Sequence, residues 1–242
     1  MIISHKHKFI FIKTRKTAGT SVEIALSEFC GPNDVITPIS PKDEKKRAEL
    51  EYRGAQNYLK YYNEYNIKDW LRILIKLKKA KKFHNHMPAL EVRNCISKDQ
   101  WKEYYKFCFE RNPFDKIISY YYWIYRNSKK KESLSDFVGG YRSRLLREKG
   151  GWGLYADLND NILVDKVYQF EHLGEAMEDI KEKLQIENIP NLVHTKNKSR
   201  EKKHKDYTEV LSQKDITIIK KVFKKEIELF NYKPTHTDKS HL

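Results

Sequence analysis

The chain has 242 residues, of which 39 % are hydrophobic and 33 % charged, a composition typical of a globular protein and unlike that of a disordered one. Its 48 Lys and Arg outnumber 33 Asp and Glu, and the formal charge of +15 favours polyanionic ligands: phosphorylated nucleotides, acidic glycans, nucleic acid or anionic lipid. Three cysteines without C-x-x-C or zinc spacing indicate free thiols in a reducing compartment and no metal site. No segment approaches the ~18 apolar residues that a membrane span needs, so we expect a cytoplasmic protein.

Strand and helix patterns alternate along the chain. The apolar run 8–13 predicts a buried strand, and a turn containing Gly19 leads into an amphipathic helix at about 20–29. The same order recurs twice, followed by a polar loop and a last helix: strand 106–110 and helix 113–126, strand 164–170 and helix 173–184, loop 194–205, helix 212–230. This alternation predicts an α/β fold, with a central parallel sheet flanked by helices in one domain over residues 1–242.

Residues 43–82 differ from this pattern. They are rich in Lys, Glu and Tyr, and the helical periodicity is strongest in 70–77. No Gly/Ser linker separates them from the rest, so we interpret them as a helical insertion that covers the substrate side, and not as a second domain.

The segment K-T-R-K-T-A-G-T-S at 13–21 joins the first predicted strand to its helix. Small residues there allow backbone N–H groups to turn inward as an anion nest, and the positive end of the following helix points to the same place. Side chains add charges and hydroxyl donors, so seven residues are expected to bind phosphate: Arg15, Lys16, Thr17, Ala18, Gly19, Thr20 and Ser21. The alternative is a basic turn capped by Thr and Ser.

A second phosphate site is predicted where strand 106–110 ends and a helix begins. Asn112 suits the N-cap of that helix and Pro113 its first turn. The Arg111 guanidinium there can hold phosphate with two parallel hydrogen bonds, and Ser119 lies in the second turn as a further donor. Two separated anion sites suggest a ligand with two phosphate groups. The alternative partner of Arg111 is Asp115 or Glu110.

Together these motifs resemble those of the sulfotransferase superfamily. Lys16–Ser21 is similar to its 5′-phosphosulfate loop, P-K-T-A-G-T-S, and Arg111–Pro113 with Ser119-Tyr120 is similar to its 3′-phosphate motif, R-D/N-P followed by S-x-Y. The segments 164–173 and 220–232 also resemble carbohydrate-type members, so the resemblance covers most of the chain. Arg15 departs from the pattern, since the family usually has Pro there, and this puts donor affinity in doubt.

The resemblance implies a P-loop-like domain that transfers sulfonate from 3′-phosphoadenosine 5′-phosphosulfate (PAPS) to a hydroxyl group by in-line displacement. Lys16 would then steady the leaving group. The His84-Asn85-His86 segment resembles the H-x-H of uronyl 2-O-sulfotransferases, which implies that His86 is the general base and that His84 contacts the substrate. An imidazole of ordinary pKa suits that task. Glu23 and Glu28 are weaker bases to consider.

In the same family a late basic loop closes over the nucleotide, which implies that Lys198 and Arg200 bind the donor. The basic surface and the H-x-H favour an acidic glycan as acceptor, with a small alcohol as the alternative.

Two other functions compete with sulfonate transfer. A P-loop kinase would need G-K-S/T, whereas Lys16 precedes Gly19, and its only tempting Mg²⁺ ligand is Asp165. A nucleic-acid-binding module would use the positive charge but would not explain the two paired motifs, so no nucleic-acid partner is expected.

Overall fold

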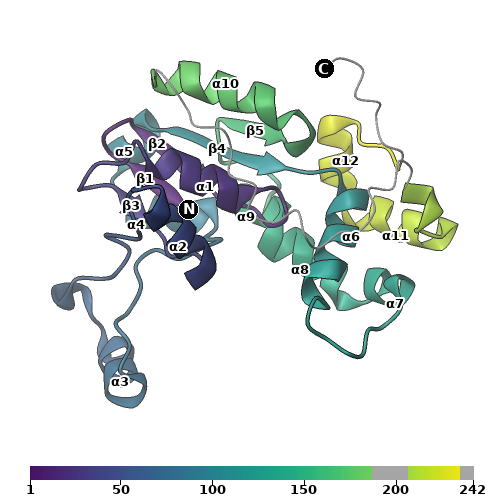
Figure 1. The fold of residues 1–242 in the computed structure, drawn as a ribbon, viewed down its shortest axis with the longest axis horizontal. Coiled ribbons are helices and arrows are strands. Elements are labelled where there is room, and N and C mark those ends of the chain that lie inside the picture. The colour runs from purple at the N-terminus through teal and green to yellow at the C-terminus, as the bar shows by residue number, and fades with distance from the viewer. Residues whose placement is uncertain (187–206, 235–242) are drawn as a thin grey trace.

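A computed structural model describes residues 1–186 and 207–234. In this part of the chain five strands form one sheet in the order β3-β1-β2-β4-β5 (Figure 1). Their bounds are β1 Ile2–Ser4, β2 Phe9–Ile12, β3 Val35–Ile36, β4 Tyr105–Glu110 and β5 Lys166–Gln169. The strands β2, β4 and β5 are parallel to one another, whereas β1 is antiparallel to both of its neighbours. The three predicted strands are confirmed, with shorter limits for the first and the third.

The prediction of a purely parallel sheet needs correction because β1 and β3 extend it. Only four residues, 5–8, join β1 to β2, and so short a connection can link only antiparallel strands. Lys8 completes the turn with φ of 50°. The strands β1 and β3 have three and two residues, too few for an alternating hydrophobic pattern to identify them in the sequence.

Three helices follow parallel strands as predicted: α1 Gly19–Ser27, α6 Pro113–Ile124 and α10 Leu173–Leu184. The side chain of Asn112 accepts the backbone N–H of Phe114, which confirms the predicted N-cap, and Pro113 stands in the first turn. The predicted last helix is broken at Phe223 into α11 Gln213–Val222 and α12 Lys224–Phe230.

Further helices had no counterpart in the sequence analysis, namely α4 Ala89–Cys95, α5 Lys98–Glu103, α7 Leu134–Gly139, α8 Tyr141–Gly150 and α9 Trp152–Tyr155, with short 3-10 turns η1 Tyr62–Glu64, η2 Phe170–His172 and η4 Tyr207–Glu209. Most of these elements are shorter than three helical turns, so their amphipathic pattern is weak.

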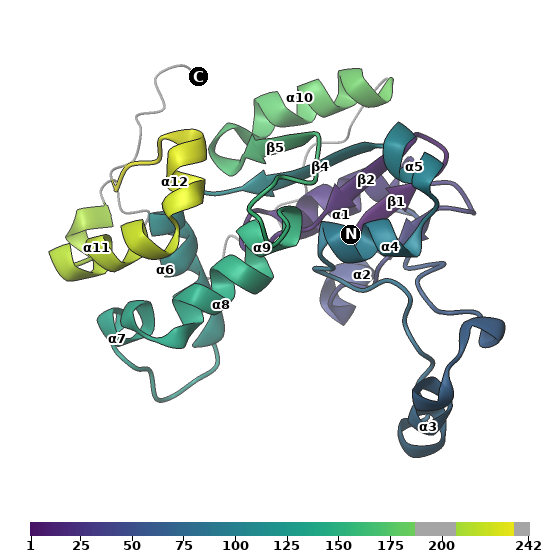
Figure 2. The same ribbon diagram turned by 180° about the vertical axis from the view of Figure 1, so that it is seen from behind.

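The insertion is only partly helical, which corrects the prediction for 43–82. Helix α2 Pro41–Glu49 begins it and α3 Ile67–Lys76 lies near its end. Between and after them the chain is irregular, apart from the turn η1 and isolated bridges such as Leu59 to Lys81. In both views α3 stands away from the rest of the molecule (Figures 1 and 2).

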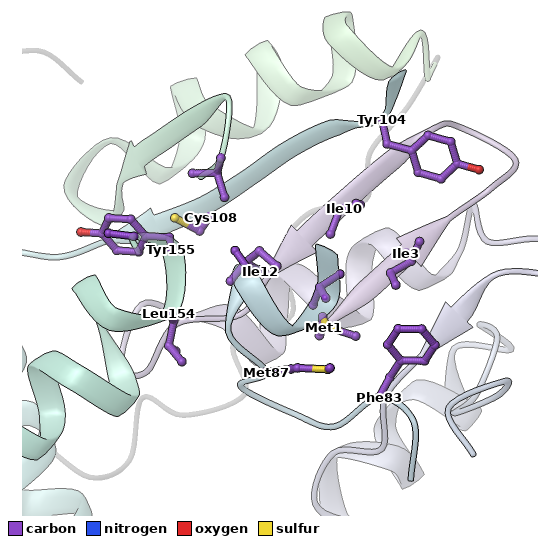
Figure 3. Close-up of a cluster of buried hydrophobic side chains, with 14 of the residues drawn as sticks. Met1, Ile3, Ile10, Ile12, Phe83, Met87, Tyr104, Cys108, Leu154 and Tyr155 are labelled. Atoms are coloured by element: carbon purple, nitrogen blue, oxygen red, sulfur yellow. The ribbon is translucent and has the colours of Figure 1, made fainter. Parts of the chain in front are cut away.

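Alternation along the strands sends side chains to two cores, one on each face of the sheet. On one face Phe11 and Phe107 pack with α1 and α10. On the other, Ile10 and Ile12 pack with Cys108 and with residues of α4 and α9 (Figure 3). Cys108, Trp152 and Tyr155 are all buried in this core. A third apolar cluster joins α6, α7, α8 and α11.

None of the helices in residues 1–186 and 207–234 is both long and apolar enough to cross a bilayer.

A buried group of charges ties the loop at 13–18 to α1. Glu23 is fully buried, and its carboxylate lies 2.6 Å from Lys13 Nζ and 3.0 Å from the N-terminal amine. Arg47 of α2, also fully buried, lies 3.7 Å away. Burial opposes ionisation of Glu23, but Lys13, the amine and Arg47 outweigh it and lower the pKa of the carboxyl to about 2. Glu23 therefore balances cations inside the protein and does not face a substrate.

Replacing Glu23 with Gln should destabilise the protein strongly. The substitution keeps the shape but leaves Lys13 buried without a balancing carboxylate and leaves Arg47 with Glu44 alone, 3.4 Å away. Removing one partner of a buried ion pair typically costs about 3–5 kcal/mol. Glu49→Gln is the matched control, because Glu49 is exposed and pairs only loosely with Lys45 at 3.9 Å. Urea unfolding should place Glu49→Gln within about 0.5 kcal/mol of wild type. Equal stability of the two variants would contradict this account of Glu23.

Candidate active site

The two predicted phosphate motifs lie at the same edge of the sheet. The loop 13–18 leaves the carboxyl end of β2, and Arg111 follows the carboxyl end of β4. These strands are parallel neighbours, with Ile12 opposite Cys108. Nη1 of the Arg111 guanidinium donates a hydrogen bond to the carbonyl oxygen of Lys16 at 2.8 Å. The carboxyl ends of parallel strands are where open α/β sheets bind ligands, so the motifs form one site.

The backbone of the loop has an uncommon conformation for its residues. Lys16 and Ala18 have φ of 66° and 56°, the left-handed region that non-glycine residues rarely occupy. Left-handed residues in a turn are a feature of anion nests, the motif that the sequence predicts for this loop. Gly19 starts α1 where a Cβ would lie 2.8 Å from Lys13 Cγ, so a larger residue would not fit without movement. Strain of this kind concentrates at functional sites.

Hydroxyl groups anchor the loop to the sheet. The hydroxyls of Thr14 and Thr17 are 2.8 Å apart, and that of Thr14 donates to the carbonyl oxygen of Phe109 in β4. The Thr17 hydroxyl, which the sequence suggested as a phosphate donor, is thus engaged within the loop. Thr20 and Ser21 are buried in the first turn of α1.

The cations of the loop differ in their surroundings. Lys13 is buried against Glu23. Arg15 is partly exposed and tied to the end of α8, because its Nε donates to the carbonyl oxygen of Lys149 at 3.1 Å and its backbone N–H to that of Gly150 at 2.7 Å. Lys16 is partly exposed, with Nζ 5.9 Å from the centre of the Trp123 ring. Arg15 and Lys16 are thus cations of the loop that solvent can reach.

The Arg111 side chain is held from three directions. Its Nε donates a hydrogen bond to the Asp115 carboxylate at 2.8 Å, and its Nη2 donates to the same carboxylate. The guanidinium carbon lies 4.3 Å from the centre of the Phe170 ring. The alternative partner considered from sequence, Asp115, is therefore present. These contacts and the one to Lys16 use one N–H on each nitrogen, whereas a guanidinium has five N–H donors. Ser119, partly buried, follows Asp115 by one helical turn, so both lie on the same face of α6.

A buried polar network behind Arg111 was not foreseen from the sequence. Glu110 accepts from the Arg111 backbone N–H, from Lys116 Nζ at 2.6 Å and from the Tyr155 hydroxyl at 3.1 Å. The backbone N–H of Asn112 donates to Glu171 at 2.8 Å. These groups come from four separate elements, and only their fold brings them together. They fix the backbone at the end of β4.

His86 lies against the phosphate loop. Its Nδ1 is 2.7 Å from the carbonyl oxygen of Lys13, and because a carbonyl can only accept, Nδ1 carries the proton. Nε2 of the neutral ring then has the lone pair. Burial, and next the charges of Lys13 and Arg15, lower the pKa of His86 to about 3. The expectation of an ordinary imidazole pKa is therefore wrong for the protein alone.

The remaining predicted site residues are His84, Lys198 and Arg200. His84 is exposed, and its Nε2 lies 3.5 Å from Glu91. Lys198 and Arg200 lie outside the described residues. Within the described residues, no three His, Cys, Asp or Glu side chains are grouped so as to hold a metal ion.

The model of the sulfotransferase family matches residues 1–233, so the chain belongs to the sulfotransferase family. A protein from Archaeoglobus fulgidus described as uncharacterized is 32 % identical over 101 residues, which cover 40 % of this chain and 82 % of that protein. No solved structure matches the chain. Family membership identifies the protein as an enzyme of sulfonate transfer with a hydroxyl-bearing acceptor, and it gives no support to a kinase or a nucleic-acid-binding module.

The half-buried, neutral His86 should make stability depend on pH. Unfolding returns its pKa from about 3 to 6.5, so the unfolded chain binds more protons and stability falls as pH drops from about 6.5 towards 3. Asn at 86 can keep a donor near the Nδ1 position and tolerates the φ of 57°. The loss of unfolding free energy from pH 8 to pH 5 should therefore be smaller in His86→Asn, by up to about 2 kcal/mol. An identical pH dependence in both proteins would contradict the burial of a neutral His86.

Proposed function

We propose that the donor is PAPS, bound across the nest at 13–19 and the Arg111 site, and that His86 accepts the proton of the attacking hydroxyl. The observation that carries this proposal is the convergence of three motifs on one loop. Arg111 donates to the carbonyl oxygen of Lys16, and His86 to that of Lys13. Arg111 and His86, which are far from the loop 13–18 in sequence, thus both form hydrogen bonds to its backbone.

The residues present fit a donor with two separated phosphate groups. The nest, the start of α1, Lys16 and Arg15 would hold the 5′-phosphosulfate, because each supplies N–H donors or positive charge. Arg111, with its remaining N–H donors, and Ser119 would hold the 3′-phosphate. When bound, the donor supplies a sulfonate whose sulfur–oxygen bond to phosphate breaks as a bond to the acceptor oxygen forms. Lys16 would stabilise the charge left on the bridging oxygen.

His86 has the tautomer that a base needs. The proton on Nδ1 is held by the Lys13 carbonyl oxygen, so the acceptor's proton would go to Nε2. Its low pKa arises with burial and with Lys13 and Arg15 nearby. A multiply charged anion in the nest would offset those cations and raise the pKa, so that His86 becomes a stronger base when the donor is bound.

The proposed acceptor is a carbohydrate hydroxyl. The formal charge of +15 favours an acidic glycan, and the exposed His84, two residues from His86, could contact it. Assays of transfer from radiolabelled PAPS to neutral glycans, acidic glycans and small alcohols test this choice. The strongest transfer is expected with acidic glycans, and preference for a small alcohol would contradict it.

Arg111→Ala should discriminate between two nucleotides. If Arg111 holds the 3′-phosphate, binding of adenosine 3′,5′-bisphosphate should weaken by about 1.5–3 kcal/mol, as for a hydrogen bond to a charged group. Binding of adenosine 5′-phosphate should change little, and Arg93→Ala, at an exposed position of α4, should change neither. Calorimetric titration measures both. Equal losses for the two nucleotides would mean that Arg111 serves only the fold.

His86→Asn should abolish most transfer while donor binding persists. The variant keeps a hydrogen-bond donor for the loop but lacks the Nε2 acceptor, and loss of a general base costs about 10²–10⁴ in rate. His84→Asn, the neighbouring control, should act more on the KM of the acceptor than on kcat. Turnover of His86→Asn within a few-fold of wild type, measured under saturating PAPS, would place the base elsewhere.

A further inference from the structure

Helix α3 exposes an apolar face that helices normally bury. Ile67, Trp70, Leu71, Leu74 and Ile75 follow the i, i+3, i+4, i+7, i+8 spacing of a core-facing stripe. All five are exposed, with Ile67, Leu74 and Ile75 at 79 %, 76 % and 75 %. Leu77, which ends the helix, is 89 % exposed. Contiguous apolar surface of this kind marks a contact with a partner or a membrane.

The helix is held in shape without cover from the body of the protein. Asn66 and Asp69 form a capping box at its start, and Lys60 pairs with Asp69 at 2.9 Å. The Trp70 ring stacks on Tyr62 and lies 5.3 Å from Tyr65. These contacts are local to residues 60–70, and α3 itself projects from the rest of the molecule in both views (Figures 1 and 2).

The segment that carries this face is rich in positive charge. Residues 60–82 contain eight basic residues against two acidic ones, Glu64 and Asp69. Both acids pair with lysines of the same segment, since Glu64 lies 2.6 Å from Lys82. Lys68, Lys78 and Lys79 are exposed. The segment is therefore both apolar and strongly cationic.

We propose that α3 binds the surface of a bilayer that contains anionic lipids, with its axis along the membrane plane. An apolar stripe with Trp and Leu beside a Lys-rich flank has the composition of interfacial membrane helices. Protein–protein interfaces, in contrast, are depleted in Lys. Ten residues span only about 15 Å, half of the ~30 Å hydrocarbon core, so the helix lies in the interface. This inference is independent of the proposed function.

Cosedimentation of the full chain with vesicles tests the proposal. Binding to phosphatidylcholine vesicles that contain phosphatidylglycerol should exceed binding to phosphatidylcholine alone and should weaken as salt is added. The double variant Leu74→Glu, Ile75→Glu should raise the lipid concentration for half-binding at least about tenfold. Leu158→Glu is the matched control, because Leu158 is 99 % exposed elsewhere on the surface, and it should bind like wild type.

The contribution of charge is tested separately with the double variant Lys78→Glu, Lys79→Glu. Its control is the double variant Lys129→Glu, Lys130→Glu, which makes the same change of charge at exposed positions outside the α3 segment. Only the first pair should lose binding to anionic vesicles. Quenching of tryptophan emission by brominated lipid should also disappear in Trp70→Phe, which places the helix itself in the interface. No preference for anionic vesicles, or binding unchanged by the α3 variants, would overturn the proposal. So would concentration-dependent self-association that those variants abolish, because it would assign α3 to contacts between copies of the chain.

Discussion

The hydrogen bond from the Arg111 guanidinium to the carbonyl oxygen of Lys16 joins two loops that are 95 residues apart in the chain. It is possible because β2 and β4 are parallel neighbours whose carboxyl ends meet at one edge of the sheet. The loop conformation, with left-handed residues on both sides of Thr17, needs such external contacts to persist, since each left-handed residue costs of order 1–2 kcal/mol. Arg111 to Lys16, His86 to Lys13 and Thr14 to Phe109 supply them.

Two cations of the site, Lys13 and Arg111, form ion pairs with carboxylates of the protein. Glu23 neutralises Lys13 below the nest, and Asp115 orients Arg111 from α6. Arg15 and Lys16 remain partly exposed at the front. This division lets a dense positive site exist within a stable fold, because the buried charges are paired and the exposed ones are partly hydrated. An anionic ligand would balance the charges of Arg15 and Lys16.

The sequence predicted what depends on short-range pattern. The strand–loop–helix units and the cap at Asn112 could be inferred from local residue order. The contact between Arg111 and the loop at Lys16 depends on the pairing of β2 with β4, so it required the fold. The two short strands β1 and β3 could not, because so few residues carry no periodic pattern. Nor could the partners of Glu110 and Glu23, which come from distant elements. The lowered pKa of His86 depends on burial and on Lys13 and Arg15 as spatial neighbours, so it required the fold.

The central claim is that the nest at 13–19 and the Arg111 site hold the two ends of one nucleotide. A crystal structure with adenosine 3′,5′-bisphosphate tests it most directly. We expect the 5′-phosphate against the backbone N–H groups of the nest, and the 3′-phosphate within hydrogen-bonding distance of Arg111 and Ser119. A bisphosphate bound at another surface, or bound at the nest with its 3′-phosphate directed away from Arg111, would contradict the account.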